Sequence, residues 1–314
     1  MHSRQGMLPL VVRELTAQTP TIVSIRLESE RREPLPPWEP GAHIDVQLLT
    51  RHERQYSLCG DPHDDRSYRI AVLREELSRG ASHYIHSFLR VGARVYARPP
   101  RNLFPLAGAA SYLLIAAGIG ITPILAMARH LASRGEDWRL VYLVRRSEDV
   151  AFATELAALG EGVRIHASSE EGRLDTAELL TAVRPGTDVY ACGPQRLLDS
   201  LDDHAVLLPS DSTLRTERFE PVRKDFLPDT PFTVTCARSE KTVEVPTDST
   251  LLLALAKADI EVPASCLRGV CGTCAVPLLG GRAEHRDSLG TDDGSGLIYP
   301  CVSRAIDTTL TLDV

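Results

Sequence analysis

The sequence lacks the marks of three common classes of protein. Lys and Arg number 35 against 42 Asp and Glu, so the net charge of −7 offers no basic surface for nucleic-acid phosphates. The N-terminal residues hold no long apolar core, so we expect no signal peptide. The uncharged stretch Leu103–Ala128 is interrupted by three glycines and two prolines, so we expect no membrane span.

Cysteine is scarce outside one motif. Three of the seven cysteines, Cys59, Cys192 and Cys236, are scattered and odd in number, unlike the disulfide framework of a secreted protein. We therefore expect a reducing, cytoplasmic setting. The sequence also contains no internal repeat and no low-complexity tract.

The other four cysteines form the most specific motif in the chain. Cys266, Cys271 and Cys274 have the spacing C-x4-C-x2-C, and Cys301 follows after 26 intervening residues. This is the spacing of a plant-type [2Fe-2S] site, in which each iron takes two thiolates and two bridging sulfides. Small residues between the ligands let backbone N–H groups face the sulfurs. Structural zinc and two disulfides are the alternatives, although zinc ligands more often come as two similarly spaced pairs.

The hydrophobic pattern predicts two further regions before the cysteine motif. Residues 1–104 contain alternating segments such as 42–48 and 68–73 between Pro, Gly and Asp clusters, which predicts a small antiparallel β-barrel. Residues 105–220 alternate continuous apolar runs, such as 112–117, with helical segments. That alternation predicts a doubly wound parallel sheet.

The last part of the chain reads as a linker followed by a small domain. Prolines and mixed charges in residues 221–230 predict the linker. Within 231–314 we expect a hairpin at the start, a strand over 309–312, and a helix over 251–257 capped by Ser249 or Thr250. A small mixed sheet around one helix, beside the cysteine loop, is typical of a β-grasp ferredoxin domain.

Two turns in the second region suggest a nucleotide site. Gly118-Ile-Gly120 follows an apolar strand and precedes a helix with Pro123 in its first turn, so a diphosphate could approach the backbone and the helix N-terminus. Cys192-Gly-Pro194 ends a later strand in the same way. Such turns face one crevice of a doubly wound sheet, although glycines also occur in turns for packing reasons.

Weaker signals lie elsewhere. The segment 54–58 combines an arginine, a tyrosine and a serine, which could hold a phosphate, an aromatic ring and a ring nitrogen, but the composition favours an ordinary strand with a surface arginine. Residues 80–82 could form an anion-binding turn. His83 and His86 are spaced like metal ligands but have no third partner nearby. Arg145 and Arg146 end a strand and either contact a ribose or phosphate or are simply solvated.

Taken in order, these motifs resemble the phthalate dioxygenase reductase family, which includes vanillate O-demethylase reductases, over essentially the whole chain. The matching segments are Arg54-Gln-Tyr-Ser-Leu58, Gly118-Ile-Gly-Ile-Thr-Pro123, Cys192-Gly-Pro194 and the four cysteines, with weaker matches at 40–43 and 102–105. The resemblance implies an FMN domain at 1–104, an NAD-binding domain at 105–220 and a [2Fe-2S] ferredoxin at 231–314. Ala81 departs from a usual glycine, and Thr216-Glu-Arg-Phe219 differs from the usual form of that segment.

The resemblance also implies roles for individual residues. The flavin site would comprise Arg54, Gln55, Tyr56, Ser57, Val72, Leu73, Arg74, Gly80, Ala81, Ser82 and Phe219. The nucleotide site would comprise Gly118, Gly120, Thr122, Pro123, Arg145, Cys192, Gly193 and Pro194. Ser57, Thr122, Cys192 and Glu217 would lie near the contact between flavin and nicotinamide, with no residue acting as a general acid or base.

The implied function is electron transfer. NADH would reduce FMN, and FMN would reduce the cluster one electron at a time. The cluster would then reduce a protein partner, by resemblance a Rieske-type oxygenase or O-demethylase. We expect a monomer that binds neither nucleic acid nor membrane. The alternatives are a stand-alone NAD(P)H flavin reductase or diaphorase, a donor to a cytochrome P450, and a non-enzymatic metal-binding module fused to a nucleotide sensor. Arg145 and Arg146 leave NADPH open.

Overall fold

The computed structural model describes residues 6–48, 53–75, 80–221, 225–289 and 296–314, and the chain falls into two units, Met1–Glu217 and Arg218–Val314. Residues 222–224 of the predicted linker lie outside the described residues. Among the residues described, no helix is both long and apolar enough to cross a bilayer.

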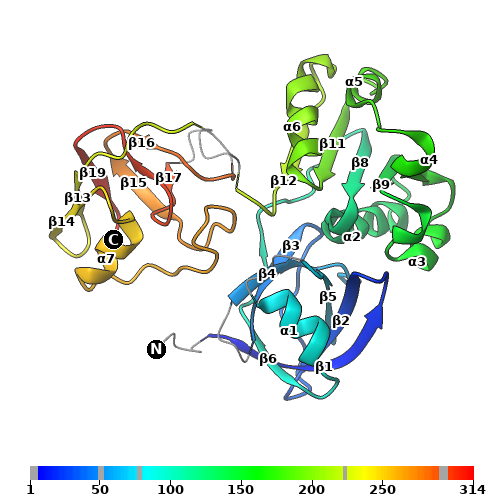
Figure 1. Cartoon of the computed structure of the whole chain (residues 1–314), viewed down its shortest axis with the longest axis horizontal. Helices are drawn as coiled ribbons and strands as arrows, with labels where there is room; N and C mark the ends of the chain where they lie inside the picture. The colour runs from blue at the N-terminus through cyan, green and yellow to red at the C-terminus, as the bar shows by residue number, and fades with distance from the viewer. Residues whose placement is uncertain (1–5, 49–52, 76–79, 222–224, 290–295) are drawn as a thin grey trace. The chain divides into compact units, whose positions relative to one another are not determined.

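The first unit begins with an antiparallel sheet of seven strands in the order β4-β3-β6-β1-β2-β5, with β7 paired to β3. The strands are β1 (Leu8–Ala17), β2 (Ile22–Ser29), β3 (Ala42–Gln47), β4 (Glu53–Ser57), β5 (Ser67–Leu73), β6 (Arg94–Ala97) and β7 (Arg101–Asn102) (Figure 1). Helix α1 (Ala81–Phe88) packs on β5. The predicted strands at 42–48 and 68–73 are confirmed. The long hairpin β1–β2 was not predicted, because Pro9 and charged residues obscure its alternation.

The second sheet of this unit is parallel throughout, in the order β10-β9-β8-β11-β12. Its strands are β8 (Ser111–Ala117), β9 (Trp138–Val144), β10 (Val163–Ala167), β11 (Thr187–Cys192) and β12 (Leu214–Glu217). The main helices are α2 (Ile121–Ser133), α3 (Ala153–Ala158), α4 (Ser168–Glu171), α5 (Thr176–Thr181) and α6 (Gln195–His204).

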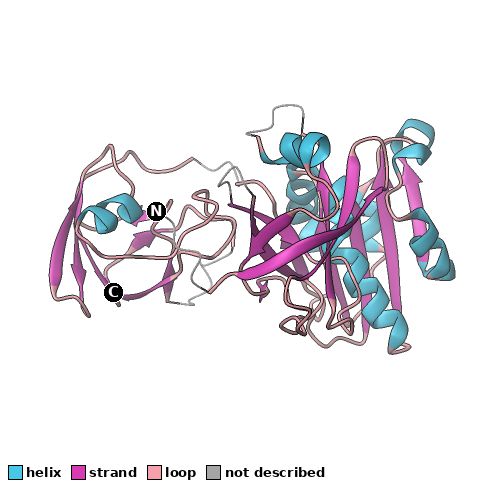
Figure 2. Cartoon of the chain, turned by 90° about the horizontal axis from the view of Figure 1, so that it is seen from below, coloured by secondary structure: helices cyan, strands magenta, loops and turns pink. Residues whose placement is uncertain are grey.

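Both faces of the parallel sheet are covered, which explains the continuous apolar run in β8. Leu114 and Ala116 pack with α2 in one core, while Leu113 and Ile115 pack with α5 and α6 in another. Figure 2 shows helices on both sides of these strands. The expected doubly wound parallel sheet is therefore present, and the carboxyl ends of its strands all lie at the same edge.

The second unit has a mixed sheet in the order β14-β13-β19-β15-β17, with a separate pair β16–β18. The strands are β13 (Phe232–Cys236), β14 (Lys241–Val245), β15 (Val276–Gly280), β16 (Ala283–Glu284), β17 (Leu297–Ile298), β18 (Arg304–Ala305) and β19 (Thr309–Leu312). Helix α7 (Leu251–Lys257) begins where expected. The Thr250 hydroxyl accepts a hydrogen bond from the Leu253 N–H at 3.2 Å and so caps the helix.

Candidate functional site

The two predicted nucleotide turns touch each other. Gly118–Gly120 forms a single 3₁₀ turn between β8 and α2, and Cys192 ends the neighbouring strand β11. A Cβ on Gly120 would lie 2.2 Å from the Cys192 carbonyl oxygen and 2.7 Å from the Gly193 nitrogen, so only glycine allows this approach. Gly118, at φ +54, has no atom within 4 Å of where a Cβ would be. The turn therefore has one closely packed side and one open side.

Polar groups hold the open turn in place. The Thr122 hydroxyl donates to the Ile119 carbonyl at 3.0 Å, and the Tyr142 hydroxyl donates to the Gly118 carbonyl at 3.1 Å. Helix α2 has no acidic residue in its first turn, and Pro123 is buried there. The positive end of the helix is thus free of competing carboxylates, which suits a diphosphate. Tyr142 was missed in the sequence, where its only signal is a hydroxyl within an apolar strand.

Three of the four residues predicted at the flavin–nicotinamide contact come together. Ser57 ends β4, and its hydroxyl donates to the Glu217 carboxylate at 3.5 Å. Glu217 ends β12 and pairs in register with Cys192 of β11. Burial raises the pKa of Glu217 to about 8, although the Ser57 hydrogen bond opposes the shift. Burial and the neighbouring Glu217 raise the pKa of the Cys192 thiol well above its usual range. Thr122 bonds to Ile119 instead.

The other predicted flavin residues lie on β4, β5 and α1. Because strand residues alternate, Arg54 and Tyr56 share one face of β4, while Gln55 and Ser57 share the other. Burial raises the pKa of Tyr56. Val72 and Leu73 end β5, and the Arg74 N–H that follows donates to the Thr21 carbonyl at 2.7 Å.

The turn at residues 80–82 forms the start of α1. Gly80 precedes the helix at φ 107, a conformation that favours glycine. Ala81 is the first helical residue and does not have a positive φ, so alanine is compatible with this position. The Ser82 hydroxyl accepts from the Glu75 N–H at 3.4 Å. The ring of His86 hydrogen-bonds to the Val72 carbonyl at 3.0 Å, which makes a metal-binding pair with His83 the poorer interpretation.

Three further predicted residues lie on other segments of the chain. Arg145 is exposed and follows β9 directly, while Pro194 precedes α6 beside Gly193. Phe219 belongs to the second unit, with 38% of its surface exposed. Its place beside a flavin ring stays a prediction.

The four motif cysteines group as two pairs. The thiols of Cys266 and Cys271 share a hydrogen bond, and so do those of Cys274 and Cys301. The Cys266 hydrogen bond lowers the pKa of Cys271 to about 6. Within the described residues, no three metal-ligating side chains gather around one point. Two pairs suit two irons, each with two thiolates, so the residues fit a [2Fe-2S] cluster.

Backbone N–H groups face two of these sulfurs, and a hydroxyl lies beside one of them. The Arg268 N–H points to the Cys266 sulfur at 3.3 Å, and the Thr273 N–H points to the Cys271 sulfur at 3.4 Å. The Thr273 hydroxyl lies 3.1 Å from the Cys271 sulfur. Gly269 has φ +69, and a Cβ there would meet the Val302 side chain at 2.7 Å. The loop conformation therefore depends on glycine at this position.

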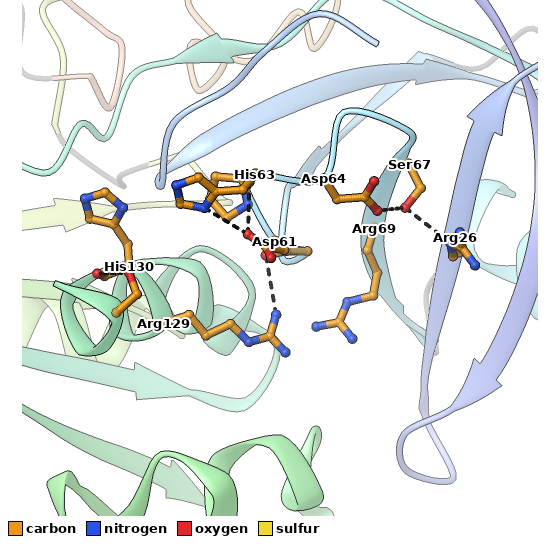
Figure 3. Close-up of a pocket in the computed structure, with 11 residues that line it drawn as sticks. Arg26, Asp61, His63, Asp64, Ser67, Arg69, Arg129 and His130 are labelled. Carbon is orange, nitrogen blue, oxygen red and sulfur yellow. Dashed lines mark hydrogen bonds and ion pairs between the residues drawn. The ribbon is translucent and has the colours of Figure 1, made fainter. Parts of the chain in front are cut away.

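A separate pocket of about 500 Å³ lies in the first unit, between β5, the loop after β4, and the end of α2 (Figure 3). Arg69 and Arg129 reach toward one another there and both pair with Glu155. Burial, together with Arg69, lowers the pKa of Arg129 to about 10. None of the predicted site residues lines this pocket.

The fold and the site define a class of protein: a reductase that combines a nucleotide-binding sheet with an iron–sulfur domain. A family model for an oxidoreductase NAD-binding domain matches residues 114–203, and one for a 2Fe-2S iron-sulfur cluster binding domain matches residues 234–305.

Curated relatives match nearly the whole chain. The chain is 39% identical to the phthalate dioxygenase reductase of Burkholderia cepacia, over 93% of both chains. It is 43% identical to the heme-dependent oxidative N-demethylase beta subunit of Ectopseudomonas mendocina, over 89% of this chain and 90% of the relative. It is 37% identical to a vanillate O-demethylase oxidoreductase of Pseudomonas sp., over 98% of this chain and 100% of the relative. The chain therefore belongs to the phthalate dioxygenase reductase family.

Solved structures agree with this assignment. Phthalate dioxygenase reductase, described as a modular structure for electron transfer from pyridine nucleotides to [2Fe-2S], matches with a TM-score of 0.71, 37% identity and 98% coverage of both chains. An intact type IV self-sufficient cytochrome P450 monooxygenase matches with a TM-score of 0.92 and 39% identity. This chain covers only 41% of that longer protein, which in turn covers 98% of this chain.

Membership of the family establishes the activity. The chain is an NADH-dependent iron–sulfur flavoprotein oxidoreductase, with FMN, a [2Fe-2S] cluster and NADH as its cofactors. It is the reductase component of an oxygenase or demethylase system. The expected family, function and cofactors are confirmed.

Proposed function

We propose that the protein that accepts electrons from the [2Fe-2S] cluster is a Rieske-type oxygenase or O-demethylase. We also propose that the chain is a cytoplasmic monomer. The observation that supports the electron path is the meeting of Ser57, Glu217 and Cys192 beside the Gly118 turn. There a bound nicotinamide would lie where the two sheets of the first unit adjoin. Phthalate dioxygenase reductase and vanillate O-demethylase oxidoreductase among the relatives favour the partner class. The uneven cysteine count favours the reducing compartment.

The residues would divide the work as follows. Arg54 and the start of α1 would bind the FMN phosphate, because both present donors to an anion. The Gly118 turn and the start of α2 would bind the NADH diphosphate. Bound FMN supplies the chemistry, accepting a hydride and releasing single electrons to the [2Fe-2S] cluster. Ser57 and Glu217 would orient the reacting rings, and no side chain needs to act as a general acid or base.

The finer architecture belongs to the same proposal. The seven-stranded antiparallel sheet would be a flavin-binding barrel covering residues 1–104, and the parallel sheet would be the NAD-binding domain at 105–220. The second unit would be a β-grasp ferredoxin at 231–314 after a linker at 221–230. The antiparallel pairings and the mixed sheet around α7 support these assignments.

A haem-containing oxygenase is the second candidate partner. One relative is the beta subunit of a heme-dependent oxidative N-demethylase, and a structural match is part of a cytochrome P450. Both cover almost all of this chain, so the same reductase architecture serves haem acceptors. The two candidates differ in the acceptor alone.

The test begins with an absorption spectrum and an anaerobic NADH titration of the purified protein. We expect flavin and iron–sulfur absorbance, both bleached by NADH, and FMN as the released flavin. Reduction should then be followed with a purified Rieske oxygenase and a purified cytochrome P450 as acceptors. Faster reduction of the haem protein would overturn the Rieske assignment. A flavin that bleaches while the cluster stays oxidised would overturn the electron path.

A further inference from the structure

Two arginines and one glutamate join the two sheets of the first unit along the line where the sheets meet, which we call the seam. Arg69 lies on β5 of the antiparallel sheet, whereas Arg129 lies on α2 and Glu155 on α3, which both pack on the parallel sheet. Arg69 donates from Nη1 and Nη2 to the two Glu155 oxygens, at 2.8 Å each. Arg129 pairs with the same carboxylate. One carboxylate therefore binds two guanidiniums that come from opposite sides of the seam.

The Cys59 carbonyl is a second acceptor shared by the same two arginines. It accepts from Arg69 Nη2 at 2.7 Å and Nε at 3.2 Å, and from Arg129 Nη1 at 3.0 Å. The Cys59 N–H donates to the Arg69 carbonyl at 2.8 Å, so Cys59 belongs to the antiparallel side. Each arginine thus has one acceptor on its own side of the seam and one on the other. We call Arg69, Arg129, Glu155 and the Cys59 carbonyl the arginine latch.

The start of α3 is also held by the antiparallel side. Phe152, the residue before α3, is only 2% exposed, and the Arg69 guanidinium lies 5.0 Å from the centre of its ring. Phe152 has φ 58, a left-handed conformation that is uncommon for a bulky residue. Its N–H donates across the seam to the Gln18 side-chain oxygen at 3.1 Å. Contacts from the antiparallel side therefore fix the position of Glu155 as well.

The Glu155 carboxylate prevents the two arginines from repelling each other. Their side chains are only 22% and 26% exposed, so water screens the two charges incompletely. Burial and the neighbouring Arg69 lower the pKa of Arg129 to about 10, which still leaves Arg129 charged at neutral pH. Figure 3 shows the two side chains reaching toward one another. Without the carboxylate, like charges from the two sides would face each other and push the seam apart.

Two regular elements connect the latch to the nucleotide turn. Helix α2 begins at Ile121, directly after the Gly118 turn, and reaches Arg129 about 12 Å further along its axis. Strand β5 carries Arg69, ends at Leu73 about 13 Å away, and contacts the Gly118 turn. Because one element belongs to each side of the seam, a shift at the latch changes the placement of one sheet relative to the other.

We propose that Glu155 is a positioning residue for hydride transfer. Through Arg69 and Arg129 it holds the antiparallel sheet against the parallel sheet, and so sets the distance between the flavin and the nicotinamide. This rests on the proposed function, in which FMN is held on the antiparallel side and NADH at the Gly118 turn. The reacting atoms must lie about 3–3.5 Å apart, so a shift of the sheets by an ångström slows the hydride step.

The variant Glu155→Gln tests the proposal in the FMN- and cluster-loaded protein. Glutamine keeps the side-chain shape but removes the negative charge between the two arginines. With saturating NADH and stopped-flow detection, we expect the limiting rate of flavin bleaching to fall at least about tenfold. The NADH concentration that gives half of this rate should stay nearly unchanged, because the groups that bind each cofactor keep their places within their own sheet.

Two measurements follow the seam without depending on turnover. The charge-transfer absorbance that arises when nicotinamide stacks on oxidised FMN should weaken in Glu155→Gln. Hydrogen exchange at the Phe152 amide, which donates across the seam to Gln18, should become faster. Both changes are expected from a seam that opens, and neither is expected from a loss of NADH affinity.

Two further variants separate charge from side-chain length. Glu155→Asp keeps the charge but shortens the side chain, so it should lose less of the limiting rate than Glu155→Gln. Arg69→Gln should slow bleaching by itself. Combined with Glu155→Gln it removes one of the two like charges, so the double variant should be no slower than Glu155→Gln alone. A double loss equal to the product of the two single losses would overturn the latch, since the side chains would then act independently.

Glu28→Gln is the matched control. Glu28 also binds two arginines, Arg13 at 3.0 Å and Arg26 at 2.9 Å, and its side chain is 29% exposed against 28% for Glu155. All three residues lie on β1 and β2 within the antiparallel sheet, so this pairing does not cross the seam. We expect the limiting rate of Glu28→Gln to equal that of the wild type.

The outcomes distinguish this inference from the proposed function. A Glu155→Gln protein that bleaches at the wild-type limiting rate, or that loses NADH affinity alone, would overturn the inference and leave the proposed function standing. An equal loss of rate in Glu28→Gln would overturn it as well, because removal of any doubly paired carboxylate would then suffice. A wild-type flavin that NADH does not bleach would overturn the proposed function itself.

Discussion

At the scale of single residues, Glu217 is the most informative side chain. Its carboxyl is enclosed between Ser57 and Cys192, two residues far from it in sequence, and burial raises its pKa to about 8. The unfolded chain would titrate the same group near its ordinary value, about 4.3. Between these two values the folded protein therefore holds a proton that the unfolded chain has lost.

The variant Glu217→Gln should change the pH dependence of stability. The wild-type free energy of unfolding should fall as the pH rises from about 4.3 to about 8 and then level off, because in this range the unfolded chain loses a proton that the folded carboxyl keeps. Glutamine removes this loss, which amounts to at most about 5 kcal/mol. Denaturant unfolding of the FMN-loaded protein at several pH values measures it. Ser57→Ala should extend the fall to higher pH, because the Ser57 hydrogen bond lowers the pKa of Glu217 in the wild type. Identical pH profiles for wild type and Glu217→Gln would contradict this account.

Cys271→Ser should abolish the normal iron–sulfur spectrum and lower the iron content from about two atoms per chain. The Cys271 sulfur accepts the Thr273 N–H at 3.4 Å and lies 3.1 Å from the Thr273 hydroxyl, so the loop holds it among groups suited to a thiolate ligand. Cys236→Ala is the matched control, because Cys236 is buried in the same unit, in the core rather than in the cysteine loop. An unchanged spectrum in Cys271→Ser would remove Cys271 from the ligand set.

At the scale of elements, local patterns predicted what depends on local chemistry. The helix cap at Thr250, the strand β8 and the Gly118 turn all follow from neighbours in sequence. The fit of Gly120 against Cys192 could not be read in that way, because it depends on which strands become neighbours. The hydrogen bond between Ser57 and Glu217 spans 160 positions, and no local pattern encodes it.

Gly120→Ala should disrupt the contact between β8 and β11 at the nucleotide turn. An added Cβ would lie 2.2 Å from the Cys192 carbonyl oxygen, which is backbone and cannot rotate away. We expect NADH-dependent flavin bleaching to slow at least about tenfold, since displacement of positioning groups by an ångström is costly. Gly108→Ala is the control, because a Cβ there meets no atom within 4 Å. Wild-type bleaching rates in Gly120→Ala would show that the close approach is dispensable.

At the scale of the whole molecule, the chain divides into two units, while the predicted limits of three domains stay a prediction. The boundary between the two units falls between Glu217 and Arg218, a few positions before the expected linker. Residues of the predicted linker that follow position 224 bond to later parts of the second unit. The Leu227 N–H donates to Glu284 at 2.7 Å, and Asp229 pairs with Arg286 at 2.7 Å. Such contacts depend on tertiary structure, and a stretch rich in proline and charge gives no sign of them.

Arg304 joins this segment to the core of the second unit. It is only 6% exposed, and it donates to the carbonyls of Ser249 and Thr230 at 2.9 Å and of Pro246 at 3.1 Å. Its guanidinium also lies 5.2 Å from the centre of the Phe232 ring. Methionine at this position would fill similar space but leave three carbonyls without their donor, at a cost of several kcal/mol.

Arg304→Met should therefore lower the temperature at which the cluster absorbance is lost, while NADH-to-ferricyanide activity of the flavin persists at that temperature. Loss of cluster absorbance and loss of flavin activity should occur at different temperatures, because the two units have separate hydrophobic cores. The buried side chains of the first unit's cores extend in sequence as far as Leu201, and those of the second unit's core start at Phe232. Arg282→Gln provides the control, since its ion pair with Asp307 is exposed and worth about 0–1 kcal/mol. If flavin reduction and cluster absorbance were lost together in Arg304→Met, the two units would have to fold as one.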